Sequence, residues 1–442
     1  MIARKLSVFT LAWPIFIEIA LFMLMGNIDI LMLGRFDSLA VGAVGNANQL
    51  FQIIGLLFTI ITSATAVLVS QSIGAKKDED VPVIVSLAFF SNFVFALILS
   101  LIILFYGESI LHLINIPADV APLAVSYMSI VGGFLFIHAI SLTLTTTIRT
   151  VGHPKVVMLV ALFTNIINVI GNYAFLFGPF NIPVLGVTGV AISTAFSRFI
   201  GLLFYVWFIQ RKLNIKISFS TVLAWPKAMI VKMIKIGVPG ALEPLSYQIG
   251  QVVIFSMINL FGIVVINTRI YVQTLAWFVY LAVIAIAQAL LIVVGHHVGS
   301  DQHDVAKKIV LKYLGLSSLI ALGMSVLLAI FGPTILTLFT DDPAVIALAS
   351  TIFIIDIFVE QGRVLNVVLV NASKGAGDVY FPAIMGMIMV WLVSVSLAYI
   401  LGVVLGYGLI GIWIGFAADE IIRGLILLVR WRSNRWQKYK WV

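Results

Sequence analysis

Long apolar segments are the feature that most constrains how this chain can fold. They follow one another along all 442 residues, and only short polar stretches separate them. A helix needs about 20 apolar residues to cross the hydrocarbon core of a bilayer. The chain is 62% hydrophobic and 10% charged, whereas a soluble domain carries about 25% charged residues. Lipid is therefore the expected solvent.

These segments predict helices, because the alternation with a period of two residues that a membrane-spanning barrel requires is absent. We predict an all-α polytopic membrane protein with twelve transmembrane helices. The predicted spans are 8–33, 45–70, 83–106, 120–147, 156–178, 187–209, 234–260, 268–294, 309–331, 345–371, 380–405 and 408–430. The first segment lacks a small-residue cleavage site, so we expect it to remain as a span.

The basic residues indicate an orientation. Most Lys and Arg lie at the two termini and in the even-numbered connections, above all between 210 and 235. Basic loops stay on the cytoplasmic side, so we expect a multi-pass protein of the cytoplasmic membrane with both termini in the cytoplasm. The net charge of +8 then reflects loops that face an anionic leaflet and predicts no nucleic-acid partner. The chain has no cysteine.

The two halves of the chain repeat each other at an offset of about 225 residues. Pro14 and Glu18 correspond to Pro239 and Glu243, and Arg149 corresponds to Lys374. Six spans per repeat give both halves the same orientation, which predicts two pseudo-symmetric six-helix bundles related by an axis along the membrane normal. The predicted parts are an N-terminal half 1–209, a cytoplasmic linker 210–233 and a C-terminal half 234–442 with a basic cytoplasmic tail.

Two like-oriented halves are typical of transporters that work by alternating access. The sequence contains no Gly-x-x-x-x-Gly-Lys-Ser/Thr phosphate loop, so an ion gradient is the expected energy source. Nor does it contain a metal-ligand cluster, a nucleophile elbow or a His–carboxylate arrangement, so we expect no enzyme activity. The adjacent His296 and His297 point to different faces of a helix, and we assign no metal site to them.

Several segments resemble the multidrug and toxic compound extrusion (MATE) family over nearly the full length. They are NIDILMLGR, VSQSIGAKK, NIINVIGNYAFLFG, RTVGHP and its repeat partner KGAGDVYFP. The resemblance implies a secondary antiporter for multidrug efflux, which exports small cationic amphipathic organic compounds in exchange for H⁺ or Na⁺. It implies no cofactor, and we expect a monomer in the lipid bilayer.

Asp29 is the candidate for the coupling ion. An ionisable group within a span costs roughly 2.5–3.5 kcal/mol and is a functional candidate by default. Asn165, Asn168 and Asn172 lie on one stripe of the fifth span, where amides can hold a cation or a carboxylate. In the family a span-one Asp and polar span-five residues form a cation site, and Asp29, Asn168 and Asn172 match it. Some relatives carry an acid at the position of Asn172, which leaves Na⁺ use and the proton number open, and interhelical hydrogen bonding is the alternative role.

Glu18 and Glu243 are repeat partners and are candidates for binding a cationic substrate. Many relatives place the span-seven acid one turn later, near Tyr247, on the same side of the helix. The alternative is a pair of structural acids that accept hydrogen bonds from backbone amides near Pro14 and Pro239.

Asp356, Glu360 and Arg363 form a charged stripe on the tenth span and complete the substrate-binding candidates. Glu360 and Arg363 have the spacing of an ion pair, and this structural role is the stronger one for them. Asp356 has no cation within one turn and is the better substrate contact. The sequence predicts a structural network at the cytoplasmic end of span twelve, with these members: Asp419, Glu420 and Arg423.

A lipid-linked saccharide flippase of the wider superfamily is the alternative function. Such a protein needs a cationic cleft for pyrophosphate, whereas the candidate intramembrane acids outnumber the bases. The bases that keep this alternative open are Arg198, Arg269 and Arg363.

Overall fold

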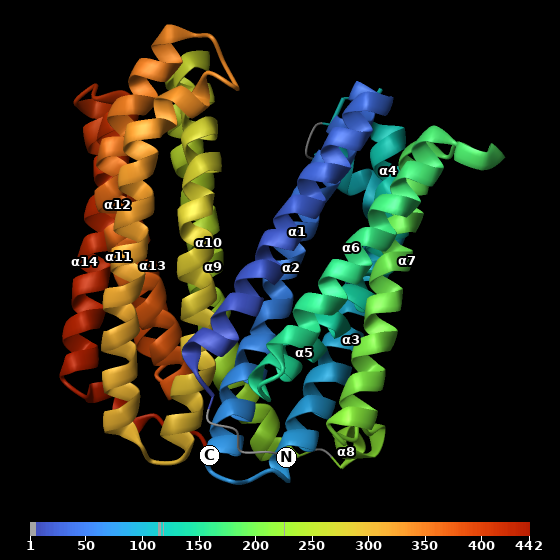
Figure 1. Cartoon of the computed structure of the whole chain (residues 1–442), viewed down its shortest axis with the longest axis vertical. Helices are drawn as coiled ribbons and strands as arrows, with labels where there is room; N and C mark the ends of the chain where they lie inside the picture. The colour runs from blue at the N-terminus through green and yellow to red at the C-terminus, as the bar shows by residue number, and fades with distance from the viewer. Residues whose placement is uncertain (1–5, 114–115, 118, 225) are drawn as a thin grey trace. The chain divides into compact units, whose positions relative to one another are not determined.

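The computed structural model describes residues 6–113, 116–117, 119–224 and 226–442, and within these residues the chain is helical without a strand (Figure 1). Arg4 and Lys5, which contributed to the predicted orientation, lie outside the described residues. The all-helical class predicted from the sequence is confirmed.

Helices long and apolar enough to cross a membrane account for most of the described chain. Nine single helices meet this description, and α4 and α5 together form one further span that is bent by 47°. The two remaining spans are α9 and α14, with 32 and 25 residues. Large apolar side chains within the helices, such as Phe105 and Leu319, are exposed, at 77% and 68%, as expected for surfaces that face lipid.

The first half of the chain supplies eight helices in the described residues. They are α1 (Val8–Phe36), α2 (Ser38–Gly74), α3 (Asp80–Leu113), α4 (Ala121–Gly133), α5 (Leu135–Thr150), α6 (Pro154–Phe177), α7 (Gly186–Trp207) and α8 (Phe219–Leu223). The sequence predicted a single helix over 120–147, and this was wrong at Phe134, where the helix breaks. The pair Gly132–Gly133 immediately before the break weakens the helix there.

The second half supplies the other helices. They are α9 (Lys227–Ile258), α10 (Ile263–Gly299), α11 (His303–Leu336), α12 (Pro343–Ala376), α13 (Tyr380–Met389) and α14 (Gly408–Arg432). Two π-helical stretches, η4 (Val390–Val395) and η5 (Ala398–Val404), continue α13. The predicted span 380–405 is thus helical, with wider turns than an α-helix.

The chain forms two compact units. Within the described residues, unit 1 comprises 17–73 and 77–237, and unit 2 comprises 6–16, 74–76 and 238–442. In unit 1, α3 packs against α4 and α5, and α7 packs against α4, α5 and α6. In unit 2, α12 is the central helix and contacts α10, α11 and α14.

Glycines allow close helix crossings in both units. A Cβ atom on Gly362 of α12 would lie 2.6 Å from the backbone nitrogen of Ile421 in α14. In unit 1, a Cβ atom on Gly171 of α6 would collide with the Ser193 side chain of α7. These crossings bring the polar faces of α12 and α14, and those of α6 and α7, against each other.

The C-terminal tail folds back onto unit 2. Trp436 stacks on Trp431 with ring centroids 4.2 Å apart. Trp441 donates its indole N–H to the carbonyl oxygen of Gly377 at 2.9 Å, and Lys440 pairs with Asp301 at 2.8 Å. The tail therefore covers the turn that follows α12.

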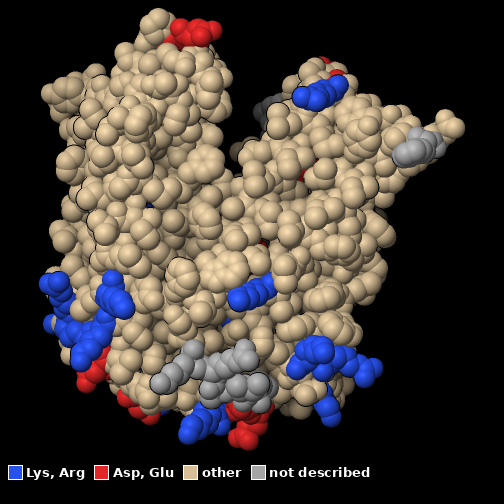
Figure 2. All heavy atoms as spheres, viewed as in Figure 1, with Lys and Arg blue, Asp and Glu red and all other residues tan. Residues whose placement is uncertain are grey.

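Charged side chains gather at the ends of the helices. In unit 2, Figure 2 shows Lys and Arg atoms at the end of the bundle where α10 and α11 meet. Acidic atoms lie at the opposite end of the same bundle, near the connection from α11 to α12. The surface between them in this view consists almost entirely of uncharged residues, as a span through lipid requires.

Candidate functional site

Asp29 lies in a chain of polar side chains that crosses from α1 to α6 and α7. Its side chain is buried, and its Oδ1 accepts a hydrogen bond from the Asn172 amide at 2.6 Å. The same amide also donates to Asn168 Oδ1 at 3.3 Å, and Asn168 donates to Thr194 Oγ1 at 3.2 Å. Asn172 Oδ1 has no hydrogen-bond partner among the described residues. The site can therefore accept one more donor or a cation.

Two further residues define the surroundings of Asp29. Arg198 lies one helical turn after Thr194 on α7 and interacts electrostatically with Asp29 and Tyr127. Asn165, which the sequence grouped with Asn168 and Asn172, instead donates to the carbonyl oxygen of Leu21 at 3.0 Å. The structure thus brings Asn168 and Asn172 to Asp29, and Asn165 bonds to the backbone of α1.

Glu18 of α1 forms an ion pair with Arg149 near the C-terminal end of α5. The two side chains are 14% and 16% exposed. Glu18 Oε2 is buried and has no hydrogen-bond partner among the described residues. A basic side chain at the end of α5 also interacts favourably with the helix dipole.

Glu243 of α9 has the corresponding partner in unit 2. Lys374 Nζ lies 3.5 Å from Glu243 Oε2 and donates a hydrogen bond to the carbonyl oxygen of Gly240 at 3.2 Å. Pro244 has no N–H, so the carbonyl group four residues earlier, at Gly240, has no partner within α9. Glu18 and Glu243 thus pair with basic side chains, whereas the sequence had suggested backbone amides as their structural partners.

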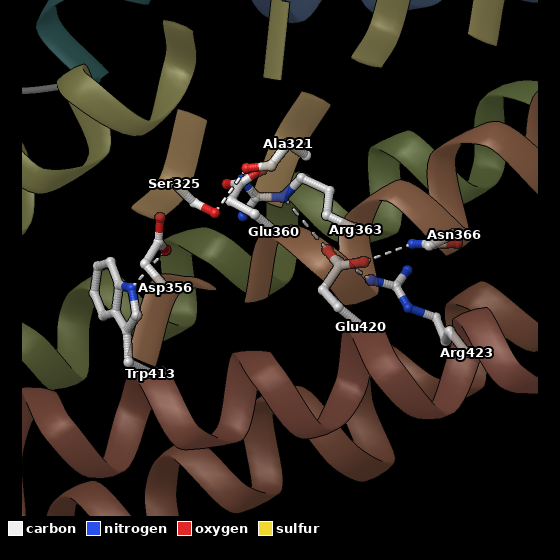
Figure 3. A network of polar contacts seen from close by, with 9 residues as sticks. All are labelled: Ala321, Ser325, Asp356, Glu360, Arg363, Asn366, Trp413, Glu420 and Arg423. Atoms are coloured by element: carbon white, nitrogen blue, oxygen red, sulfur yellow. Dashed lines mark hydrogen bonds and ion pairs between the residues drawn. The ribbon is translucent and has the colours of Figure 1, made fainter. Parts of the chain in front are cut away.

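Unit 2 contains a larger charged network between α12 and α14, which Figure 3 shows. Arg363 forms an ion pair with Glu360, as their spacing predicted, and a second one with Glu420 at 3.9 Å. The Arg363 guanidinium lies 5.9 Å from the ring centroid of Tyr280 on α10. The Arg363 side chain is 22% exposed, whereas that of Glu360 is fully buried.

The network continues along α14, as the sequence predicted. Arg423 pairs with Asp419 at 2.9 Å and with Glu420 at 3.3 Å. Asn366 of α12 donates to Glu420 Oε2 at 2.8 Å (Figure 3). These contacts cross the helix interface that Gly362 permits.

Asp356 lies farther along α12. Its Oδ1 accepts a hydrogen bond from the Trp413 indole at 3.0 Å, and its side chain is 3% exposed. Asp356 Oδ2 has no partner among the described residues. The Asp356 carboxylate is therefore enclosed between α12 and α14, with one oxygen that can accept a further donor.

The sequence missed the partners of four acids. Arg149, Lys374, Trp413 and Arg198 were not assigned to any site, because they are distant along the chain from the acids that they face. A signal was present for two of them, since Arg149 and Lys374 stand at the same distance after Glu18 and Glu243.

A metal site was not expected from the sequence. Within the described residues, no three His, Asp or Glu side chains lie together as metal ligands would. His297 Nδ1 lies 2.8 Å from Gln302 Oε1 at the end of α10.

Comparison with known proteins accounts for the repeat and the fold. The MatE family model matches residues 14–174 and again residues 239–400. An uncharacterized transporter of Bacillus subtilis, YisQ, is 37% identical over 98% of this chain and 95% of its own length. The probable multidrug resistance protein NorM of Thermotoga maritima is 26% identical over 97% of this chain and 92% of its own length.

Solved structures share the fold. An outward-facing multidrug resistance MATE family transporter matches with a TM-score of 0.86 at 18% identity, over 97% of this chain and 95% of that one. A MOP superfamily transporter from Pyrococcus furiosus matches with a TM-score of 0.88 at 17% identity over the same shares. With both halves matched by the family model, this chain belongs to the MATE family of membrane transporters.

Proposed function

We propose that this transporter is a secondary antiporter that exports cationic amphipathic organic compounds in exchange for H⁺ or Na⁺ by alternating access. The observation that carries the proposal is the buried carboxylate of Asp29, held by the amide of Asn172. A carboxylate that is held by an amide, with the guanidinium group of Arg198 nearby, can exchange its bound cation or proton while its neighbours stay in place.

The likeness to NorM supports multidrug efflux, since that relative is described as a probable multidrug resistance protein. YisQ is described as an uncharacterized transporter, so the substrate class is inferred from the site. Acids at repeat-related positions in the two halves favour cationic cargo.

The proposed coupling residues are Asp29, Asn168 and Asn172, with Asn165 supporting α1 from the same helix. The proposed substrate-binding residues are Glu18, Glu243, Asp356, Glu360 and Arg363. Glu18, Glu243 and Arg363 are partly exposed and are the ones that a substrate meets first.

Transport of ethidium into proteoliposomes tests this proposal. We expect uptake to follow an imposed pH gradient or Na⁺ gradient in the wild type. Asp29→Asn keeps the hydrogen bond from Asn172 but carries no exchangeable charge, so it should abolish ion-driven uptake. Asp304→Asn, at the exposed first turn of α11, is the matched control. Normal ion-driven uptake by Asp29→Asn would refute the coupling site.

The orientation and the division into 1–209, 210–233 and 234–442 remain predictions. With both termini in the cytoplasm, Lys308 faces the cytoplasm and Leu338 the opposite side. Because the chain has no cysteine, Lys308→Cys and Leu338→Cys can be labelled singly in intact cells with an impermeant maleimide. We expect only Leu338→Cys to react, and the reverse would invert the orientation.

Arg269 favours a second candidate function, a flippase for a lipid-linked anion. It bonds to Gln251 at 3.3 Å and lies 4.8 Å from the Phe255 ring centroid, yet it has no acidic partner among the described residues. The Pyrococcus furiosus transporter is described as having a binding pocket of reverse polarity, which suggests a different function for that protein. Arg269→Gln should leave ethidium uptake unchanged under our proposal. Translocation of a fluorescent lipid-linked phosphate by the wild type that is lost in Arg269→Gln, without ion-driven ethidium uptake, would favour the flippase.

A further inference from the structure

We infer that Arg149 and Lys374 are specificity-determining residues, each a tethered cation that a cationic substrate must displace from Glu18 or Glu243. The inference rests on the proposed function, in which these two acids bind substrate. It goes beyond that function by naming the residues that determine which organic cations bind.

The first support is the repeat of the same pair in both halves. Glu18 and Glu243 occupy matching positions on α1 and α9, and their partners occupy matching positions near the ends of α5 and α12. Each pair joins the first helix of its half to the helix that ends the fourth span of that half. A chance surface ion pair does not recur at matching positions in two helix bundles.

The second support is access. The four side chains of these pairs are 12–16% exposed, whereas Arg423 and Asp419 are each 2% exposed. A side chain that reaches the surface can exchange its partner, and a sealed pair cannot do so without opening the helix interface. Glu18 Oε2 also has no hydrogen-bond partner among the described residues, so this acid can accept a further donor.

The third support is the second acceptor of Lys374. Its ammonium group lies between Glu243 and the Gly240 carbonyl group that Pro244 leaves without a donor. When a substrate takes the carboxylate, Lys374 keeps this hydrogen bond and is not stranded in an apolar surrounding. In unit 1 the position matching Pro244 is Ile19, which has its own N–H. We therefore assign the easier exchange to Glu243.

The exchange has a consequence for selectivity. The displaced basic side chain stays beside the carboxylate and keeps its charge, so electrostatic attraction gives the incoming cation little net affinity. The gain must come from apolar contact of the incoming molecule with its surroundings. The pairs therefore favour amphipathic organic cations over Na⁺ or K⁺, which bring no apolar surface.

Equilibrium binding of ethidium to purified protein in detergent tests this mechanism without any gradient. In Lys374→Gln the carboxylate of Glu243 has lost its competitor, so we expect ethidium to bind about two to five times more tightly, as for loss of one partly exposed ion pair. KCl should now compete with ethidium, which it should not do in the wild type. The control is Lys308→Gln, which changes an exposed lysine at the start of α11.

Two further variants separate this role from a structural one. Glu243→Gln/Lys374→Gln should bind ethidium more weakly than Lys374→Gln and lose the competition by KCl. Lys374→Arg, which holds a carboxylate more firmly, should bind ethidium a few times more weakly than the wild type. Arg149→Gln should show the same gain as Lys374→Gln, through Glu18.

Unchanged or weaker ethidium binding in Lys374→Gln with a wild-type Tm would overturn the inference. If that variant does not fold, tighter binding by Lys374→Arg would overturn it instead. The proposed function fails differently, by the absence of ion-driven ethidium uptake in the wild type.

Discussion

The polar centres of the two units are built in opposite ways. In unit 1, the single carboxylate of Asp29 accepts a hydrogen bond from Asn172, which also bonds to Asn168, and Arg198 is its charged neighbour. Unit 2 contains four carboxylates and two guanidinium groups between α12 and α14, all within a few turns of one another. Figure 3 shows all of these groups except Asp419. The two units thus share the arrangement of helices and the pairs Glu18–Arg149 and Glu243–Lys374. They differ in the number and kind of buried charged side chains.

The difference distinguishes two roles of buried charged groups: exchange of an ion or proton, and stabilisation of the fold. A single carboxylate whose direct hydrogen bond comes from a neutral amide can change its protonation or its bound ion at small cost to the fold. A network of opposite charges is stable only while every member stays in place, because removing one leaves another uncompensated. We therefore infer that unit 1 carries the coupling step and that the charges on α14 mainly hold unit 2 together.

The largest expected effect is that of Arg423→Gln. It leaves the buried Asp419 without its guanidinium partner and Glu420 with Arg363 alone, so the free energy of unfolding should fall by about 3–5 kcal/mol. Thermal unfolding of the purified protein in detergent measures this loss. Asp29→Asn is the counterpart in unit 1 and should change the same free energy by less than about 1 kcal/mol. Equal losses would remove the distinction between the two units.

Gly362→Ala should have the next largest effect. Its Cβ would meet the backbone of Ile421, which cannot move aside, so we expect a loss of about 1–3 kcal/mol from overpacking. In unit 1, Gly171→Ala meets the Ser193 side chain, which can rotate, although it then loses its hydrogen bond to the Asn168 carbonyl. Thermal unfolding should rank Gly362→Ala as the more destabilising, and the reverse order would contradict the rigid α12–α14 interface.

Asn172→Ala and Asn165→Ala test unit 1 alone. Each removes one buried or partly buried amide and should cost about 1–2 kcal/mol of stability. Only Asn172 bonds to Asp29, so only Asn172→Ala should reduce ion-driven ethidium uptake beyond the change in protein yield. The test compares ion-driven ethidium uptake of the two variants per folded transporter. Equal losses of uptake would argue against the assignment of Asn172 to the coupling site.

The smallest effect is expected for Asp301→Asn, at the contact of the tail with unit 2. The hydrogen bond and charge of Lys440 hold the pKa of Asp301 below its usual value of 3.8. Because the pKa is lowered on folding, the pair stabilises the tail above that value and the effect is lost as the pH falls below it. Asp301 is fully exposed, so Tm at neutral pH should hardly change. A large drop would show that the tail depends on this pair.

Hydropathy predicted the helical class and the spans because lipid imposes the length and apolar character of each span. It did not predict the break at Phe134 or the π-helical turns after Met389. These depend on the local backbone conformation and packing, which hydropathy does not report. The Glu360–Arg363 pair followed from spacing along one helix. Glu18 and Arg149 are 131 residues apart, and only the shared position of their counterparts in the repeat pointed to them.

The site around Asp29 was predicted in part for the same reason. Helical periodicity placed the three asparagines on one stripe, but it could not tell which of them lies level with the carboxylate of another helix. The position of α6 along the axis of α1 decides which asparagine reaches Asp29. It brings Asn172 to the carboxylate and Asn165 to the carbonyl group of Leu21. Long-range relations of this kind need the packed structure.

Gly377 ends α12 with a φ of 93°, and the Tyr439 carbonyl and Trp441 ring occupy the space that a side chain at position 377 would need. Three residues earlier on the same turn stands Lys374. An affinity tag or fluorescent protein fused directly after Val442 would disturb the contacts of Tyr439 and Trp441 with this turn. It would thereby shift Lys374, the partner of Glu243. Assays of substrate preference should accordingly be run on protein with an unmodified C-terminus, or with a cleavable tag removed beforehand.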